Sequence, residues 1–440
     1  MSLTEDLQRA AVTKDSLDLT GVPEGFDALV MADLAQARGG LTVFVARDGS
    51  RATSFEAALG FFAPELKLLR LPAWDCLPYD RISPSAAVSA ERLATLTRLG
   101  RGGWGKIPTL LITQSASLLQ RLPPKAAVLG AGYSARVGDS VDMAELERYF
   151  AINGYHRAST VSERGEFAVR GGVIDVFPPG AEEPVRLDLF GDTLETIRGF
   201  DRESQRSTRK LARVDLLPVS EALLDGAAVA RFRKGYVAAF GAPGDDPLYA
   251  AVSEGARRAG LEHFLPLLYA ETATLFDYLP SDALIGLDHL ALAARDERLA
   301  MISDAYEARA AADRKAHYRP LPPSALYLSN TEWDEGVAGR PARRLVPFHQ
   351  EAGAGVVDLG AKLGRTFAAE RAQDSVNLFE AAADHARRLA GSGKRVLFAS
   401  WSEGASERLG TMLADHGLGD VGFARDWRSA TPSSHSVLER

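Results

Sequence analysis

The sequence is poor in cysteine and has no long apolar run. Cys76 is the one cysteine among 440 residues, which excludes an internal disulfide, and no clustered thiols or paired histidines form a zinc-binding pattern. No segment approaches the length of apolar sequence that a membrane-spanning helix needs. The first residues, MSLTEDLQRA, also lack the apolar core of a secretion signal. We therefore expect a cytoplasmic protein without a metal site and without membrane contact.

Lysine is also scarce. Nine of the 51 basic residues are Lys, so segments whose basic residues are all Arg are expected from composition alone. The formal net charge is -7, and the pI is about 5.7. Binding to nucleic acid depends on clustered Lys and Arg that neutralise phosphates. The acidic balance therefore argues against a large nucleic-acid groove.

The order of expected helices and strands divides the chain into several domains. Buried strands alternate with helices at the beginning of the chain, which predicts an α/β fold with a parallel sheet. A segment of short strand-like runs then predicts a small inserted α+β domain, after which the α/β pattern returns and a further α/β domain follows. The tail SATPSSHSVLER has little apolar content and is expected to be loose. The four expected domains are residues 1–131, 132–214, 215–345 and 346–440.

The stretch 164–206 is the most informative part of the chain. Between Pro184 and Gly191 the residues alternate, with Val185, Leu187 and Leu189 on one face of a strand and Arg186, Asp188 and Phe190 on the other. Gly191-Asp192 is a two-residue turn signal, and residues 193–200 supply a partner strand. The pattern predicts a hairpin with one core face and one presented face.

A pair of glycines interrupts the preceding apolar run, residues 167–177. Gly171-Gly172 indicates a bulge or a tight bend that redirects Arg170. We therefore expect Arg170, Arg186 and Phe190 to share one surface. The structural alternative is that Arg186 pairs locally with Asp175 or Asp188 and that the hairpin half-buries Phe190.

The sequence offers no convincing catalytic constellation. The turn after the first expected strand, ARDGSRATSFEAAL, has one glycine and no lysine, so it cannot form the phosphate-binding loop of an ATPase. Residues 391–394, GSGK, precede a strand and indicate a helix end. At the end of another strand, His289 follows Asp288 where a motor ATPase needs Glu. We expect no catalytic residue and no enzyme activity from this chain alone.

The loop of residues 74–84 has two possible roles. Its Trp, Tyr and Pro residues are typical of binding surfaces. The alternative, which we favour, is that the aromatic side chains fix an irregular loop onto the sheet.

Several longer segments resemble those of a known family. These are LPAWDCLPYDRISPS, PTLLITQSASLLQRLPP, GEFAVRGGVIDVFPPG and RLDLFGDTLETIRGFDRESQRS. Together they resemble the N-terminal region of the bacterial transcription-repair coupling factors (Mfd), which is itself similar to the excision-repair protein UvrB. The resemblance extends over essentially the whole chain, and the central block is its most specific part.

The resemblance implies a degenerate, helicase-like parallel-sheet domain (UvrB-like) that has lost its ATP site. It also implies that residues 132–214 form the domain that binds the repair protein UvrA. In that family the contacts to UvrA fall on positions that match Arg170, Arg186 and Phe190. Arginine and aromatic residues are the common composition of binding hot spots.

The resemblance further implies that the chain is an N-terminal fragment. RNA polymerase and double-stranded DNA are then expected to bind regions absent here, and ATP and magnesium to act in an absent motor. Three functions stay open: a module that recruits UvrA, an active UvrB-like nucleotide-dependent repair enzyme, and a regulatory module whose UvrA surface is covered in the resting full-length protein.

Overall fold

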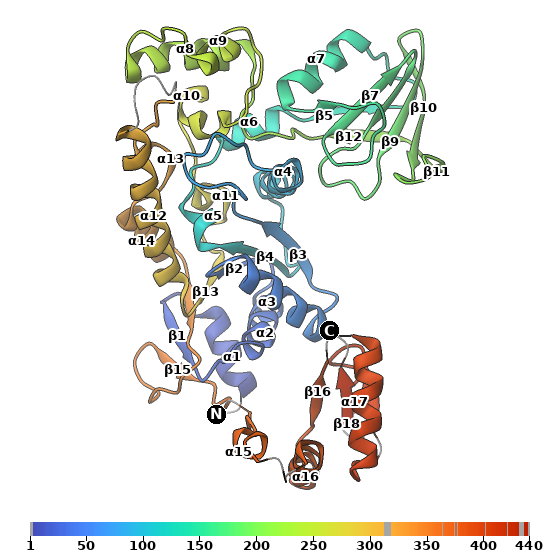
Figure 1. Ribbon diagram of the computed structural model, residues 1–440, viewed down its shortest axis with the longest axis vertical. Helices are drawn as coiled ribbons and strands as arrows, with labels where there is room; N and C mark the ends of the chain where they lie inside the picture. The colour runs from blue at the N-terminus through green and yellow to red at the C-terminus, as the bar shows by residue number, and fades with distance from the viewer. Residues whose placement is uncertain are drawn as a thin grey trace.

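An all-parallel, seven-stranded sheet forms the centre of the protein (Figure 1). The computed structural model describes residues 3–311, 318–362, 364–373, 375, 377–400, 402–419, 421–430 and 435–438. The strand order is β15-β1-β14-β13-β2-β4-β3, so strands from before and after the small inserted domain lie side by side. The strands are β1 (Leu17–Thr20), β2 (Leu41–Ala46), β3 (Lys67–Leu71), β4 (Thr109–Gln114), β13 (Leu284–Asp288), β14 (Ala342–Leu345) and β15 (Val356–Asp358).

Helices cover both faces of this sheet. On β2, Val43 and Val45 point into one core, and Phe44 and Ala46 point into the other, which explains why the whole strand is apolar. One face packs against α1 (Leu3–Val12), α2 (Phe26–Arg38) and α3 (Gly49–Phe62). The other packs against α4 (Ala86–Arg101), α5 (Ser115–Leu119), α11 (Leu275–Tyr278) and α14 (Asn330–Ala338). The predicted α/β fold class is confirmed.

A third core joins a group of helices to the loop after β3. Trp74 and Tyr79 of this loop are buried in it, so the aromatic side chains do fix the loop, but they pack against helices and not onto the sheet as expected. The Trp74 indole donates to Glu221 at 3.0 Å, and Glu221 also pairs with the buried Arg92 at 2.5 Å. The elements around this core are α8 (Gly226–Phe240), α9 (Pro247–Ser253), η1 (Leu261–Phe264), α10 (Leu265–Leu268), α12 (Ala291–Ala311) and α13 (Pro323–Leu326).

Two of these helices are shorter than the sequence pattern indicates. The residues from 221 to 240 have a helical pattern, but α8 begins at Gly226 because the Asp225 side chain accepts a hydrogen bond from the Ala228 N–H and caps the helix there. The helical pattern continues from 248 to 259, but α9 ends at Ser253. Among the described residues, no helix combines the length and apolar content that a membrane crossing requires.

The small inserted region stands apart from the central sheet, at the upper right of Figure 1. It follows α6 (Lys125–Gly130) and contains a two-stranded sheet, a six-stranded sheet in the order β11-β10-β9-β8-β7-β6, and α7 (Met143–Asn153), whose Leu146 and Phe150 enter the core of this region. Its strands are β5 (Tyr133–Arg136), β6 (His156–Arg157), β7 (Glu166–Arg170), β8 (Val173–Val176), β9 (Val185–Phe190), β10 (Thr193–Phe200), β11 (Ser207–Leu211) and β12 (Arg213–Leu216).

The last part of the chain forms a small α/β unit, drawn in red in Figure 1. The GSGK segment lies between α16 and β16, as expected for a helix end. Trp427 connects the unit to the end of α3, where the backbone N–H of Trp427 donates a hydrogen bond to the Phe61 carbonyl at 3.0 Å. The elements are α15 (Ala368–Arg371), α16 (Leu378–Gly391), β16 (Leu397–Ala399), α17 (Glu403–Asp415), β17 (Val421–Ala424) and β18 (His435–Leu438).

The expectation of a loose tail was wrong for the part of it that the structure describes. Residues 435–438 form β18, which pairs in parallel with both β16 and β17. Backbone hydrogen bonding on two sides holds this strand, although the tail as a whole is poor in apolar residues. Residues 431–434 and 439–440 of the predicted tail lie outside the described residues.

Candidate partner-binding surface

The predicted hairpin is present as β9 and β10. Phe190 pairs with Thr193, so Gly191 and Asp192 form the two-residue turn, and Gly191 has a φ of +58°. Val185 and Leu187 are buried, and Leu189 packs against the same core. The predicted core face of this strand is therefore confirmed.

Gly171 and Gly172 form a tight bend, one of the two possibilities predicted for them. They connect β7 and β8, and Arg170 pairs directly with Val173 across the turn. Gly171 has a φ of +61°, and a Cβ atom on Gly172 would lie 2.6 Å from the Leu189 carbonyl oxygen. Two glycines are needed here because one residue turns the chain and the other lets β9 approach.

Strand pairing places Arg170, Arg186 and Phe190 on one face of the sheet. Asp175 of β8 pairs with Ala168 on one side and with Arg186 on the other, and directly paired residues share a face. Arg170 lies two residues after Ala168, and Phe190 lies four residues after Arg186, so the period of two keeps all of them on this face. We call this surface, with its three named residues, the β7–β9 face.

Asp175 connects the two arginines. Its Oδ1 accepts a hydrogen bond from Arg186 Nε at 2.6 Å, and its Oδ2 accepts one from Arg186 Nη2 at 2.9 Å. Arg170 Nη1 lies 3.6 Å from Oδ2, and Arg170 also donates to the Ser159 carbonyl. The Asp175 side chain is 2% exposed, whereas those of Arg186 and Arg170 are 21% and 53% exposed. One half of the structural alternative is therefore present, because Arg186 does pair with Asp175.

The other half of that alternative is wrong. Phe190 is 77% exposed and is not half-buried by the hairpin. It occupies the last position of β9, next to the Gly191-Asp192 turn. The face therefore combines two arginines held by one carboxylate with a protruding aromatic ring.

The same face carries a second ion pair that the sequence reasoning did not single out. Asp188 Oδ2 accepts a hydrogen bond from Arg198 Nη2 at 2.5 Å and another from the Thr196 hydroxyl. Burial opposes ionisation of Asp188, but these hydrogen bonds outweigh it and lower its pKa. Alternation along residues 193–200 could not have placed Thr196 and Arg198 on this face, because the strand register shifts between Leu194 and Thr196, so that Leu194 and Ile197 both face the core.

Arg186 contacts an aromatic ring in addition to the carboxylate of Asp175. Its guanidinium carbon lies 4.9 Å from the centre of the Phe200 ring, within the range of a cation–π contact. Hydrogen bonding to Asp175 raises the pKa of Arg186, against the opposing effect of burial. The arginine is therefore a charged group in a defined orientation.

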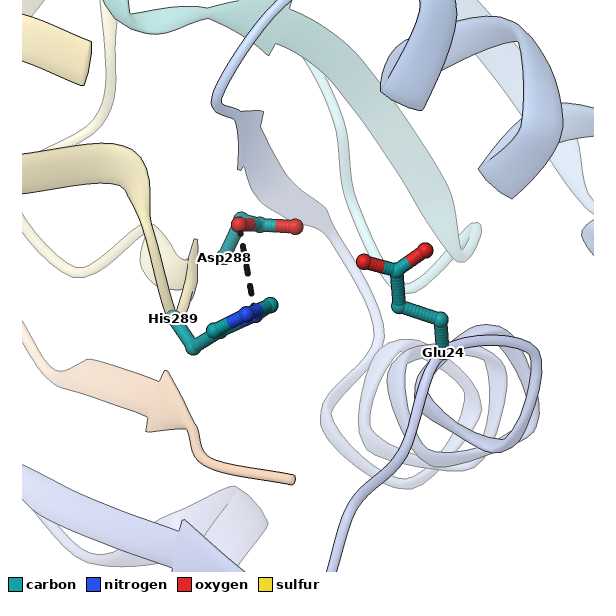
Figure 2. A group of neighbouring side chains, drawn as sticks. All are labelled: Glu24, Asp288 and His289. Carbon is teal, nitrogen blue, oxygen red and sulfur yellow. Dashed lines mark ion pairs between the residues drawn. The ribbon is translucent and has the colours of Figure 1, made fainter. Parts of the chain in front are cut away.

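A second cluster of polar side chains lies at the carboxyl end of β13 and contains Glu24, Asp288 and His289 (Figure 2). Their potential metal-ligating atoms all lie within 4.8 Å of one another. His289 Nδ1 lies 3.5 Å from Asp288 Oδ1, the contact marked in Figure 2. The geometry by itself could hold a cation.

Two arginines already neutralise these carboxylates. Arg51 Nε lies 2.9 Å from Asp288 Oδ2, and the same guanidinium pairs with the buried Asp27. Arg47 Nη1 lies 2.6 Å from Glu24, and this hydrogen bond lowers the pKa of Glu24. A divalent cation here would have to displace or repel both guanidinium groups, so the donor set does not fit a metal site.

The turn between β2 and α3 also lacks the means to hold a phosphate. Asp48 caps α3 by accepting a hydrogen bond from the Arg51 N–H at 2.7 Å, so a carboxylate already occupies the N-terminal turn of the helix. Gly49 begins the helix, and its φ is not positive. A second anion would meet the charge of Asp48.

The β7–β9 face lies inside a region that is similar to a known family of domains. The family model described as the UvrB interaction domain matches residues 134–221, the region that contains this face. The chain is 30% identical over 391 residues to the transcription-repair-coupling factor of Escherichia coli, covering 88% of this chain and 33% of that protein. The Haemophilus influenzae factor is 33% identical over 60% of the chain, and the Myxococcus xanthus factor is 40% identical over 44% of it.

The chain spans a third or less of the length of these relatives, since the aligned part covers 33%, 23% and 16% of the three proteins. Within that part, the identity extends over both the parallel-sheet domain and the inserted region in the Escherichia coli alignment, which covers 88% of the chain. The resemblance found in the sequence is thereby confirmed, and the chain corresponds to the UvrB-like region of the transcription-repair-coupling factors.

Proposed function

We propose that this chain is the UvrA-recruiting module of a transcription-repair-coupling factor, with Arg170, Arg186 and Phe190 as its contact residues for UvrA. The observation that carries the proposal is the 77% exposed Phe190 beside two oriented arginines, inside the segment that matches the UvrB interaction domain. Aromatic residues and arginine are enriched at protein interfaces, and arginine is enriched among their hot spots.

The chemistry of the face supports a protein partner. The face carries three arginines and two aspartates, which are Arg170, Arg186, Arg198, Asp175 and Asp188. Positive and negative charges are too evenly balanced there for the face to attract a phosphate backbone. Arg170 retains the most exposed guanidinium of those near Asp175. We expect UvrA to offer a carboxylate to Arg170 and an apolar recess to Phe190.

In this role the module brings UvrA to RNA polymerase stalled at a DNA lesion, in the cytoplasm. The role requires no catalytic residue, cofactor or metal from this chain. Binding of RNA polymerase and double-stranded DNA, and the ATP-driven movement that releases the polymerase, belong in this proposal to parts of the longer relatives outside the aligned region.

The test is a calorimetric titration of purified UvrA with the chain and its variants. We expect Phe190→Ala and Arg170→Ala each to weaken binding by about thirtyfold or more, because loss of one hot-spot anchor costs roughly 2 kcal/mol. The matched control is Phe348→Ala, which removes a phenylalanine that is 70% exposed but lies outside the inserted region. The control should bind UvrA like the unmodified chain.

The unfolding free energy of Phe190→Ala should stay within about 0.5 kcal/mol of the unmodified value, because the ring has little packing to lose. Unchanged UvrA affinity in both Phe190→Ala and Arg170→Ala would contradict the proposed function. Equal losses in Phe190→Ala and in the Phe348→Ala control would also contradict it, since the effect would then not be specific to this face.

A further inference from the structure

We infer that Asp175 is a positioning residue, which holds Arg170 and Arg186 in the orientation in which they meet the partner. The inference rests on the proposed function, because it concerns the same surface. It adds a residue that the partner does not touch. The Asp175 side chain is 2% exposed, and therefore it can act on the partner only through the two arginines.

The place of Asp175 in the sheet explains why one carboxylate can reach both arginines. It lies on β8, the strand between β7 and β9, and it is directly paired with Arg186. Arg170 stands at the end of β7 on the same face, so its guanidinium can turn back to within 3.6 Å of Oδ2.

Orientation matters because an arginine side chain has many rotamers. Immobilising such a side chain on binding costs conformational entropy, and a guanidinium that is already held does not incur that cost again. Arg186 is held at two points by Asp175 and lies over the Phe200 ring at 4.9 Å. Its free edge is therefore fixed before the partner arrives.

Asp188 provides the contrast within the same face. It is also an aspartate paired with an arginine on a neighbouring strand, at 2.5 Å, but its partner is Arg198. Its side chain is 23% exposed, against 2% for Asp175. Asp188→Asn consequently removes the same charge from the same surface without releasing Arg170 or Arg186.

The experiment compares UvrA affinity of the full chain carrying Asp175→Asn or Asp188→Asn. Asparagine keeps the shape of aspartate but loses the charge that holds both guanidinium groups. We expect Asp175→Asn to weaken UvrA binding about tenfold, the effect of releasing two long side chains. We expect Asp188→Asn to change the affinity less than about threefold.

A double-mutant cycle separates positioning from a general loss of structure. Because Asp175 acts through both arginines, Asp175→Asn should add about threefold or less in a chain that already carries Arg186→Ala, where only Arg170 remains to be released. Additive losses would overturn the inference. So would wild-type affinity in a folded Asp175→Asn chain.

A readout without UvrA keeps the inference separate from the proposed function. The Arg186 Nε–H signal in a nuclear magnetic resonance spectrum, assigned by its disappearance in Arg186→Lys, should be protected from exchange in the unmodified chain and unprotected in Asp175→Asn. Protection that persists in Asp175→Asn would overturn the inference, even if UvrA binds nowhere on this chain. Failure of Phe190→Ala and Arg170→Ala to weaken binding would count against the proposed function alone.

If Asp175→Asn does not fold, Arg186→Lys provides the second variant. Lysine keeps the charge but cannot make the two-point contact with Asp175. The inference predicts that UvrA binding by Arg186→Lys falls by about tenfold. Binding at the unmodified strength would overturn it.

Discussion

Arginine–aspartate pairs occur in two regions of this molecule, and they differ in exposure. At the carboxyl end of β13, the side chains of Arg51, Asp27 and Asp288 are at most 4% exposed. On the β7–β9 face, Asp175 is equally buried, but the arginines that it holds are 21% and 53% exposed. The same chemical pair is thus internal in one region and presented in the other.

Sheet architecture accounts for the difference. The central sheet is parallel and has helices on both faces, so polar groups at the strand ends must find partners inside the protein. The six-stranded sheet is mostly antiparallel, and its helix α7 packs on the face that forms the core. Its other face can therefore carry charged side chains that remain available to a partner.

The largest effect is expected from breaking the internal network. Arg51→Ala leaves the carboxylates of Asp27 and Asp288, each 3% exposed, without their shared guanidinium. Removing one partner from a buried ion pair costs about 3–5 kcal/mol because the remaining charges stay desolvated. The loss should appear as a lower unfolding free energy in urea denaturation.

Arg344→Ala is the control for this prediction. Arg344 also pairs with an aspartate, Asp18, at the central sheet, but the two side chains are 46% and 25% exposed. Its removal should cost less than about 1 kcal/mol. Equal losses in Arg51→Ala and Arg344→Ala would show that exposure does not separate the two kinds of pair.

An intermediate effect is expected on the β7–β9 face itself. Arg186→Ala leaves the 2% exposed Asp175 with only the longer contact to Arg170, so it should lower the unfolding free energy by about 1–3 kcal/mol. Arg170→Ala removes a side chain that is 53% exposed and should change it by less than about 0.5 kcal/mol. Urea denaturation of both variants measures the difference, and equal values would mean that Asp175 does not depend on Arg186.

This pairing marks a limit of prediction from the sequence. The alternation of residues 185–190 and the turn at Gly191-Asp192 were enough to predict the hairpin and its core face, because both signals are local. The partner of Arg186 remained open between Asp175 and Asp188. The pairing register of β8 with β9 decides which aspartate lies opposite Arg186. The local alternation of residues 185–190 does not contain that register.

The internal network was beyond prediction for a similar reason. Asp288 was recognised as a strand-end acid, but its partners Arg51 and Arg47 lie 237 and 241 positions away in the sequence. Short strands were missed as well: β1 has four residues and β15 has three, too few for a periodic pattern. These short strands are defined by their pairing with neighbouring strands and not by their own composition.

The smallest effect is expected from nucleotide, and it sharpens the contrast between the proposed partner-binding surface and the internal network of ion pairs. Titration of magnesium-ATP into the chain should give no binding heat, because Asp48 occupies the N-terminal turn of α3 and Arg51 is committed to Asp27 and Asp288. Measurable binding that is lost in Gly49→Val would contradict this expectation and would favour the alternative of an active UvrB-like enzyme. Without such binding, the residues at the β13 edge act on folding stability alone, because their charges are already satisfied by one another.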